Sequence, residues 1–402
     1  MHAKGTSKLG IVPLREEYRL PVFYFVLNGA FASWQSFLNL HLDRIGFSSM
    51  QIGILGALFI STAALVIPFW GMFADKYGNN RVMLLLTSAC ALLVFFIGRT
   101  LSFHWMFVFV LLVSVFHQPS GAVVDGMAAG FVRENRRFSF GQFRLWSSVG
   151  YASLSLLVGY LIRQGTEVIF KVSAGLFLLL SLFNLFTMPR KPVTGRILVN
   201  FRSFGLFFRN APLLVFLLLI LFFGMAIAPL QQFINLYYLD IGASDSFIGW
   251  VFFVQAIPEI PAYFIVSKIV KRSGPEKVIL FAMAISMLRM LCYGLISNPA
   301  IAIFFSIFHC VTIAVFLVGV VEYVQDRTPA HLRTTGQALI WAFHFGAGLT
   351  LGNISLGFLR DSIGMNGAML VHAGLAFLIL LISLLLFIRQ GLGSSPQNSP
   401  SD

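Results

Sequence analysis

Five ionisable side chains interrupt long apolar stretches of this sequence, and their types point to binding chemistry. Asp125 stands in SVFHQPSGAVVDGMAAG and Arg144 in FGQFRLWSSVGYA, while Glu259, Arg289 and His309 lie in three later apolar stretches. Carboxylate and guanidinium groups can make paired hydrogen bonds to hydroxyl groups or to a carboxylate. An imidazole can take up and release a proton near neutral pH. The sequence therefore predicts a site for a small polar solute, for protons, or for both.

Glu259 lies between Pro258 and Pro261 in the segment FVQAIPEIPAYFIV. Each proline lacks an N–H and leaves a carbonyl one turn earlier without its helical partner. At membrane depth such a break is tolerated only beside protein or a wet cavity. We therefore interpret Glu259 as a ligand for substrate or for protons. The alternative is an ion pair with Arg289 that only holds two helices together.

The elements that position these side chains are predicted to be transmembrane helices. The chain of 402 residues is 58% hydrophobic and only 11% charged, whereas soluble domains are about one quarter charged. Apolar runs of about 20 residues, the length that spans a bilayer, recur twelve times. The first run is itself a full span, so we expect no cleavable signal peptide. The spans are predicted at 20–42, 50–71, 82–102, 105–130, 144–163, 168–188, 211–236, 247–269, 278–297, 300–324, 336–358 and 366–388.

The net charge of +13 is explained by the orientation of the protein in the membrane rather than by binding to nucleic acid. If the N-terminus is cytoplasmic, 22 of the 28 Lys and Arg residues fall in the tails and connections on that side. This is the positive-inside bias of membrane proteins. It predicts that both termini are cytoplasmic and that the basic side contacts anionic lipid. No nucleic-acid motif accompanies the charge.

The chain is expected to form two halves. The basic segment 189–210 would link an N-terminal six-helix bundle over 20–188 to a C-terminal six-helix bundle over 211–388. Residues 1–19 and 389–402 would be cytoplasmic tails, the second of them disordered. GMFADKYGNNRV after the second span and SKIVKRSGPEKV after the eighth can be aligned, with Gly78 opposite Gly274. Repeated halves around a midplane site are typical of secondary transporters.

The loop GMFADKYGNNR resembles the G-x-x-x-D-K/R-x-G-x-R/K-R/K loop of the major facilitator superfamily. The resemblance implies a gating role for this loop, whose matching residues are Gly71, Asp75, Lys76, Gly78 and Arg81. Glycine permits the tight turn, and an aspartate suits a helix N-terminus. The second copy has Lys271 in place of the aspartate, so gating is expected to depend mainly on the first.

Further segments are similar to the lactose permease and phenylpropionate permease-like proton symporters of this superfamily. FGQFRLWSSVGYA, AIPEIPAYF, SMLRMLCYG and FHCVTIAVFLVGVVEYV carry the likeness. It implies that Asp125, Arg144, Tyr151, Glu259 and His309 bind substrate. It also implies that Glu259, Arg289, His309 and Asp125 take part in proton coupling. The chain departs from lactose permease at Thr312, where that permease has an acid.

The predicted class is an all-α membrane protein of twelve helices in two pseudo-symmetric bundles. The expected function is proton-coupled import of a small organic solute, such as a sugar, an oligosaccharide or an aromatic acid, across a bacterial cytoplasmic membrane. A proton-antiport exporter of drugs or metabolites and a non-transporting receptor or scaffold are the alternatives. We expect a monomer without cofactor or metal, and no enzyme activity, because no nucleophile elbow, phosphate loop or metal-ligand spacing is present.

Several other residues are expected to serve packing. The three cysteines lie in apolar runs without CxxC spacing. The same expectation applies to the histidines of the other spans, His117, His344 and His372. Four glycines in the eleventh span, Gly346, Gly348, Gly352 and Gly357, would allow close helix approach, with sliding between states as the functional alternative.

Overall fold

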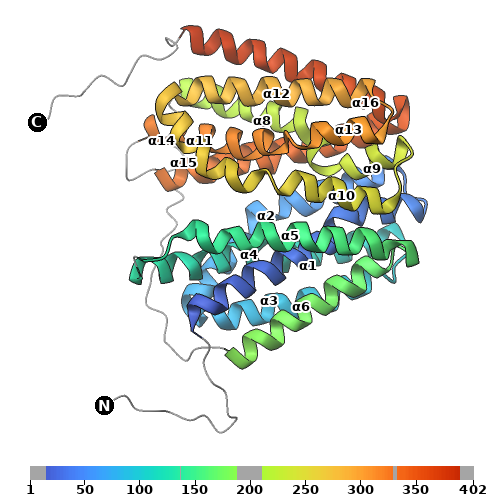
Figure 1. Cartoon of the computed structure of the whole chain (residues 1–402), viewed down its shortest axis with the longest axis vertical. Helices are drawn as coiled ribbons and strands as arrows, with labels where there is room; N and C mark the ends of the chain where they lie inside the picture. Colours follow the sequence, from blue (N-terminus) through green and yellow to red (C-terminus); the bar gives the residue numbers. More distant parts are fainter. Residues whose placement is uncertain (1–14, 136, 188–210, 329–332, 390–402) are drawn as a thin grey trace, which may run out of the picture. The chain divides into compact units, whose positions relative to one another are not determined.

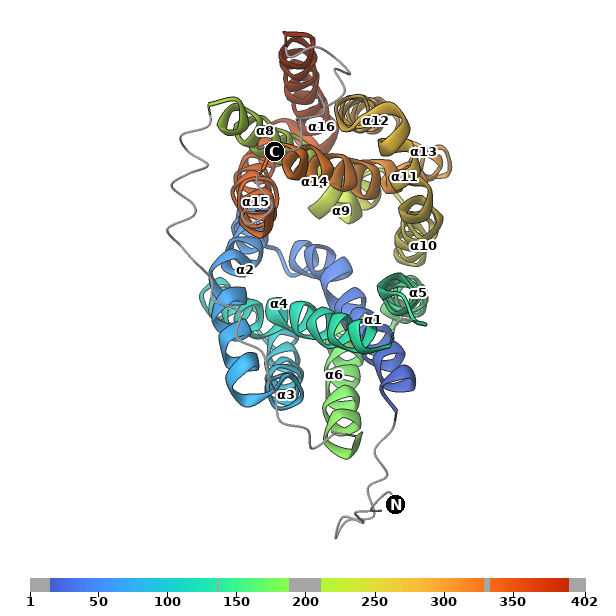
Figure 2. The same cartoon turned by 90° about the vertical axis from the view of Figure 1, so that its left-hand side faces the viewer.

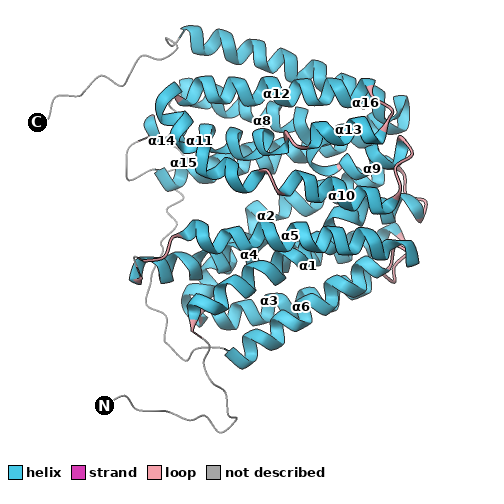
Figure 3. Cartoon of the chain, viewed as in Figure 1, coloured by secondary structure: helices cyan, strands magenta, loops and turns pink. Residues whose placement is uncertain are grey.

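The structure is a computed structural model that describes residues 15–135, 137–187, 211–328 and 333–389. Within these ranges every regular element is a helix and no strand occurs (Figure 3). The predicted all-helical fold is therefore confirmed. The predicted linker over 189–210 lies outside the described residues. The described residues resume at Ala211, where a helix begins. The predicted disordered tail also lies outside them after Arg389.

Contacts between helices divide the chain into two compact units, and each unit is described by itself (Figure 1). Unit 1 contains the helices of the N-terminal half and one helix from the middle of the chain. Its helices are α1 (Glu16–Arg44), α2 (Ser49–Tyr77), α3 (Asn79–Ile97), α4 (Phe103–Glu134), α5 (Phe140–Leu161), the short η1 (Ile162–Gln164), α6 (Val168–Thr187) and α10 (Asp245–Ala256).

Unit 2 contains the remaining helices and is more irregular, since several of its spans are broken. Two π-helical turns, η3 and η5, interrupt the tenth and eleventh predicted spans. The elements are α8 (Ala211–Gln232), α9 (Ile234–Asp240), α11 (Glu259–Ser273), α12 (Pro275–Leu295), α13 (Pro299–Ser306), η3 (Val311–Val315), α14 (Phe316–Asp326), α15 (Arg333–Ile340), η5 (Trp341–Gly348) and α16 (Leu349–Arg389).

Nine helical segments of the described ranges are long and apolar enough to cross a membrane. The last, Thr335–Arg389, turns sharply at Gly364, whose φ of 74° separates two predicted spans. The two other predicted spans are helical but are not among the nine. The first is the polar helix α1, and the eighth is divided into α10 and α11, of 12 and 15 residues. The chain is thus an all-helical, multi-span membrane protein.

Helix α1 lies beside other helices of unit 1 (Figure 2), and this burial allows it to be polar. It contacts α4, α5 and α6, and most of its side chains are buried. Its polar groups find partners within α1 and on a neighbouring helix: Ser33 donates to the carbonyl of Gly29 in α1, and Ser173 of α6 donates to the carbonyl of Ala30. A helix inside a bundle does not need an apolar, lipid-facing surface. A hydropathy scale therefore underestimates its tendency to span the membrane.

Helix α10 packs against α5 in unit 1, although its sequence falls in the predicted second bundle. Two glycines permit this packing: a Cβ added to Gly159 would lie 2.7 Å from the Cα of Gly249. At the start of α10, Asp245 lies 2.6 Å from Arg44 at the end of α1. The predicted division into six and six helices stays a prediction.

The two aligned loops share one backbone conformation. Gly78 lies between α2 and α3 with φ 94° and ψ 136°, and Gly274 lies between α11 and α12 with φ 82° and ψ 151°. Side chains other than glycine rarely adopt a positive φ. This shared requirement explains why glycine recurs at the same place in both copies of the sequence repeat.

The glycines of the eleventh span serve packing within unit 2. A Cβ added to Gly352 would lie 2.4 Å from Cβ of Ala228 and 2.5 Å from the carbonyl oxygen of Met225, both on α8. A Cβ on Gly348 would lie 2.5 Å from the carbonyl oxygen of Leu221. Helix α8 therefore contacts η5 and the start of α16 backbone to backbone, as small residues allow.

Candidate functional site

The charged site of unit 1 is formed by α4 and α5. Oδ2 of Asp125 on α4 lies 2.6 Å from Nη1 of Arg144 on α5, near the start of that helix. The side chains are 35% and 55% exposed. Two of the residues that the resemblance implied to bind substrate therefore lie in contact, and both remain partly exposed.

Tyr24 completes this site and was missed by the sequence analysis. Its hydroxyl donates a hydrogen bond of 2.6 Å to Oδ1 of Asp125, so the two carboxylate oxygens have different partners. Tyr24 lies on α1 and is almost fully buried. A single phenol gives no sign of its partner, but the unusual polarity of the first span was a usable signal.

Tyr151 lies further along α5 than Arg144. Residues seven apart occupy the same helix face about 10 Å apart along the axis. The hydroxyl of Tyr151 is 2.8 Å from Oγ of Ser36 on α1. Its ring centroid lies 6.5 Å from that of Phe31 and 6.4 Å from that of Phe252 on α10. Tyr151 thus continues the face of α5 that begins with Arg144.

In unit 2, Glu259 lies directly after the predicted helix break. Helix α10 ends at Ala256, and α11 begins at Glu259. Pro258 causes the break, since it has no N–H to donate back into α10. Pro261 causes none, because it stands in the first turn of α11, where helical N–H groups have no partner in any case. The sequence therefore located the break correctly but overestimated the effect of the second proline.

Arg289 is a buried guanidinium that stabilises an irregular part of the tenth predicted span. Its Nε donates to the carbonyl of Phe305 at 2.9 Å, and its Nη1 donates to Oγ1 of Thr312 at 2.5 Å. These two partners lie on either side of His309, just before and inside the π-helical turn η3. Arg289 is only 1% exposed, so its role is first to hold this segment in place.

Among the described residues, no carboxylate lies within ion-pair distance of Arg289. Its Nη2 atom and Nδ1 of His309 are both buried without a hydrogen-bond partner there. Arg289 and Glu259 both lie near Cys310, and Arg289 also lies near His309. The three predicted residues of this half therefore lie near one another, around Cys310.

The remaining histidines of the spans lie in packed surroundings. Nδ1 of His344 is 2.8 Å from the carbonyl oxygen of Ile220, and Nδ1 of His372 is 3.1 Å from that of Ala226. His117 is stacked on Phe31 with ring centroids 4.8 Å apart. Over the described ranges, no group of three His, Cys, Asp or Glu residues could hold a metal ion, and all three cysteines are free.

Only some residues of the loop that resembles a gating motif make contacts or have a special backbone conformation. Gly78 has the positive φ described above, whereas a Cβ on Gly71 would meet nothing within 4 Å. Lys76 lies over the ring of Tyr77 at 5.1 Å. Asp75 is half-buried, and Arg81 at the start of α3 is exposed. A gating role for these residues stays a prediction.

The fold and the ionisable groups in each unit define a class, the multi-span helical secondary transporters. A model of the MFS_1 like family matches residues 18–371. The chain belongs to this family, and therefore to the major facilitator superfamily of transporters, which are not enzymes.

Relatives at low identity cover most of the chain. The protein named "Putative nucleoside transporter YegT" from Escherichia coli (strain K12) is 26% identical over 363 residues, 83% of this chain and 82% of its own length. Maltose permease from Geobacillus stearothermophilus is 24% identical over 376 residues, 92% and 94% of the two chains. The crystal structure of the nucleoside transporter NupG matches with a TM-score of 0.85 at 17% identity, covering 93% and 99%. The structural match shows the shared fold.

Proposed function

We propose that the chain is a proton-coupled symporter that imports a small, neutral, hydroxyl-rich solute of the nucleoside or sugar type by alternating access. The ion pair of Asp125 and Arg144 carries this proposal. The two groups in contact have no net charge, so they suit hydroxyl groups, which both donate and accept, better than a lone carboxylate. This argument favours a sugar or nucleoside over an aromatic acid.

Support for the substrate class also comes from relatives. Maltose permease and the nucleoside transporters are named for solutes that carry several hydroxyl groups. The likeness to the lactose permease branch points the same way. Tyr151 would then cover the apolar face of a sugar ring, and Asp125, Arg144 and Tyr24 would bind its hydroxyl groups. Glu259 and His309 of unit 2 are proposed as further substrate contacts.

Proton coupling is assigned to Glu259. A carboxyl group at a helix break can exchange protons with water more readily than one inside a regular apolar helix. The acid that lactose permease has in its tenth span is replaced here by Thr312, whose hydroxyl accepts from Arg289. Glu259 is therefore the principal acid for this role in unit 2. Asp75 and its neighbours in the loop after α2 would control opening.

The test is transport into proteoliposomes that contain the purified protein, with uridine, maltose and phenylpropionate offered separately. We expect uridine or maltose to accumulate when the outside is acidic and to equilibrate without accumulation when the pH is equal on both sides. Liposomes that contain the Arg144→Ala variant are the control for leakage. Accumulation of phenylpropionate alone would contradict the substrate class, and accumulation without a pH gradient would contradict proton coupling.

A proton-antiport exporter is the second candidate. It is supported by similarity to multidrug resistance protein MdtG from Citrobacter koseri, 24% identical over 308 residues, 72% of this chain and 75% of that protein. The same proteoliposomes distinguish the two functions, because an antiporter accumulates its solute when the inside, rather than the outside, is acidic.

A further inference from the structure

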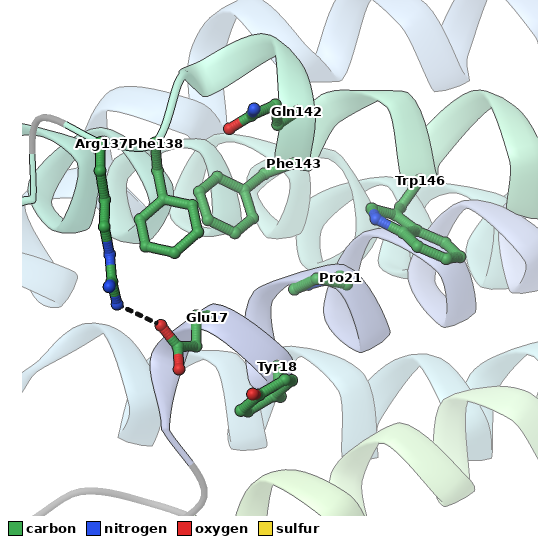
Figure 4. A pocket seen from close by; sticks show the side chains of 8 residues that line it. All are labelled: Glu17, Tyr18, Pro21, Arg137, Phe138, Gln142, Phe143 and Trp146. Atoms are coloured by element: carbon green, nitrogen blue, oxygen red, sulfur yellow. Dashed lines mark hydrogen bonds and ion pairs between the residues drawn. The ribbon is translucent and has the colours of Figure 1, made fainter.

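A cavity of about 490 Å³ lies on unit 1 where α1 and α5 begin, and neither Asp125 nor Arg144 lines it (Figure 4). Its floor is apolar, formed by Pro21 of α1 with Phe138 and Phe143. The centroids of these two phenylalanine rings are 5.8 Å apart. None of these residues takes part in the proposed transport chemistry.

Two amphipathic aromatic side chains border the apolar floor. Tyr18 is 61% exposed and Trp146 is 41% exposed, and both line the cavity. Tyrosine and tryptophan with this exposure near helix ends are typical of the headgroup level of a bilayer, where an apolar ring body and a polar tip are both accommodated. The aromatic border of the cavity therefore suits the level where hydrocarbon and headgroups meet.

Positive charge is in excess around the polar end of the cavity, where Arg137 lines it and Arg15 lies beside it without lining it. Glu17 accepts from Arg137 at 2.8 Å and lies 3.7 Å from Arg15. The carboxylate is 14% exposed, whereas the two arginine side chains are 71% and 80% exposed. Two guanidinium groups thus share one carboxylate and leave one positive charge. Exposed ion pairs contribute little stability, so these arginines can turn toward another anion.

We propose that this cavity binds an anionic glycerophospholipid of the leaflet on which α1 and α5 begin. The phosphate would bind Arg137 and Arg15, since guanidinium groups bind phosphate through paired hydrogen bonds. The acyl chain would lie on Pro21, Phe138 and Phe143, beside Trp146. The ligand therefore bridges the start of α1 and the turn between α4 and α5. A soluble phosphate compound would use only the polar end.

The experiment places the full-length protein in nanodiscs of phosphatidylcholine that contain a minor fraction of phosphatidylglycerol with brominated acyl chains. Bromine quenches tryptophan fluorescence on contact, and the difference between the unchanged protein and Trp146→Phe isolates the signal of Trp146. We expect phosphatidylglycerol to quench Trp146 beyond its fraction in the bilayer, and brominated phosphatidylcholine at the same fraction not to do so.

Charge variants then test the binding residues. Arg137→Gln should weaken the apparent affinity for brominated phosphatidylglycerol roughly fivefold, because each basic residue near a membrane surface contributes about that factor. Glu17→Gln should strengthen the affinity, since it removes the competing carboxylate. Arg133→Gln removes an exposed arginine from the end of α4 that does not line the cavity, and it should leave the affinity unchanged.

Four results would overturn the proposal. Equal quenching by both brominated lipids would mean ordinary contact with bulk lipid. Absence of quenching by either would mean that protein covers the cavity. An equal loss in Arg137→Gln and Arg133→Gln would mean general attraction of anionic lipid to a basic surface. Soluble glycerol phosphate in excess should not restore Trp146 fluorescence, and restoration would assign the site to a free phosphate compound.

Discussion

The carboxylate of Asp125 lies 2.6 Å from the guanidinium of Arg144, and the two residues come from different helices of unit 1. Because the second carboxylate oxygen accepts from Tyr24, three helices meet at one acid. A substrate that replaces either contact would change how α1, α4 and α5 are held together. This relationship connects binding to the positions of the helices.

The first prediction concerns this pair. Arg144→Ala should weaken substrate binding by about tenfold or more, since hydrogen bonds to charged groups contribute roughly 1.5–3 kcal/mol. Tyr24→Phe should have a smaller effect, because it removes one hydrogen bond and leaves the ion pair. Binding is measured by a scintillation proximity assay. The radiolabelled ligand is the solute that the proteoliposome experiment has identified. Unchanged monodispersity of the purified variant controls for folding, and normal binding by Arg144→Ala would remove this residue from the site.

The second prediction concerns coupling by Glu259. Glu259→Gln should still bind the solute and exchange it across the membrane, but it should lose accumulation driven by a pH gradient. The amide keeps the size and hydrogen bonding of the side chain but cannot carry a proton. Counterflow and gradient-driven uptake are measured on the same proteoliposomes. If the variant accumulates solute, Asp125 becomes the candidate for the proton site, and Glu259 becomes a substrate contact only.

The third prediction concerns the buried guanidinium of unit 2. Thr312→Val should destabilise the protein by about 1–3 kcal/mol, because an N–H of Arg289 loses its partner away from water. The midpoint of thermal unfolding in detergent is the measurement. Thr62→Val is the matched control, since its hydroxyl donates only to the carbonyl of Leu58 in its own helix. Equal shifts of the unfolding midpoint in the two variants would show that the contact with Arg289 does not stabilise the protein more than an ordinary hydrogen bond within one helix.

The fourth prediction concerns the glycines that pack α8 against the eleventh span. Gly352→Ala should destabilise the protein by about 1–3 kcal/mol, the usual range for overpacking, because its new methyl group would collide with Ala228 and Met225. Gly374→Ala is the control, in the last predicted span beyond the kink at Gly364, where an added Cβ meets nothing within 4 Å. The unfolding midpoints of the two variants are compared. A stable Gly352→Ala protein would show that this interface can separate at little cost.

The fifth prediction concerns orientation. The distribution of basic residues predicts that both termini are cytoplasmic, because 22 of the 28 Lys and Arg residues fall on that side. A reporter that fluoresces only in the cytoplasm, fused after residue 402, should be active. A reporter active only outside the cytoplasm should be inactive at the same place. The reverse pair of results would show that the C-terminus lies outside the cytoplasm and would contradict this prediction.

The sequence alone determined the fold class, because a bilayer restricts what a chain can do. Every backbone polar group within lipid must be satisfied inside its own segment, so long apolar runs become helices. The same restriction makes each ionisable side chain in an apolar run conspicuous, which is how Asp125, Arg144, Glu259, Arg289 and His309 were found. The break before Glu259 also followed from local chemistry, since proline acts on its own helix.

Tertiary structure decided what these residues touch. Nothing local indicates that Tyr24 reaches Asp125, a hundred positions later in the chain, or that Arg289 bonds to Phe305 and Thr312 on either side of His309. Nor does the sequence show that α10 packs on α5 in unit 1. Such contacts depend on how helix faces pack and on which helix approaches which. Hydropathy records only whether a residue tolerates lipid, so it cannot distinguish partners among helices that are all apolar.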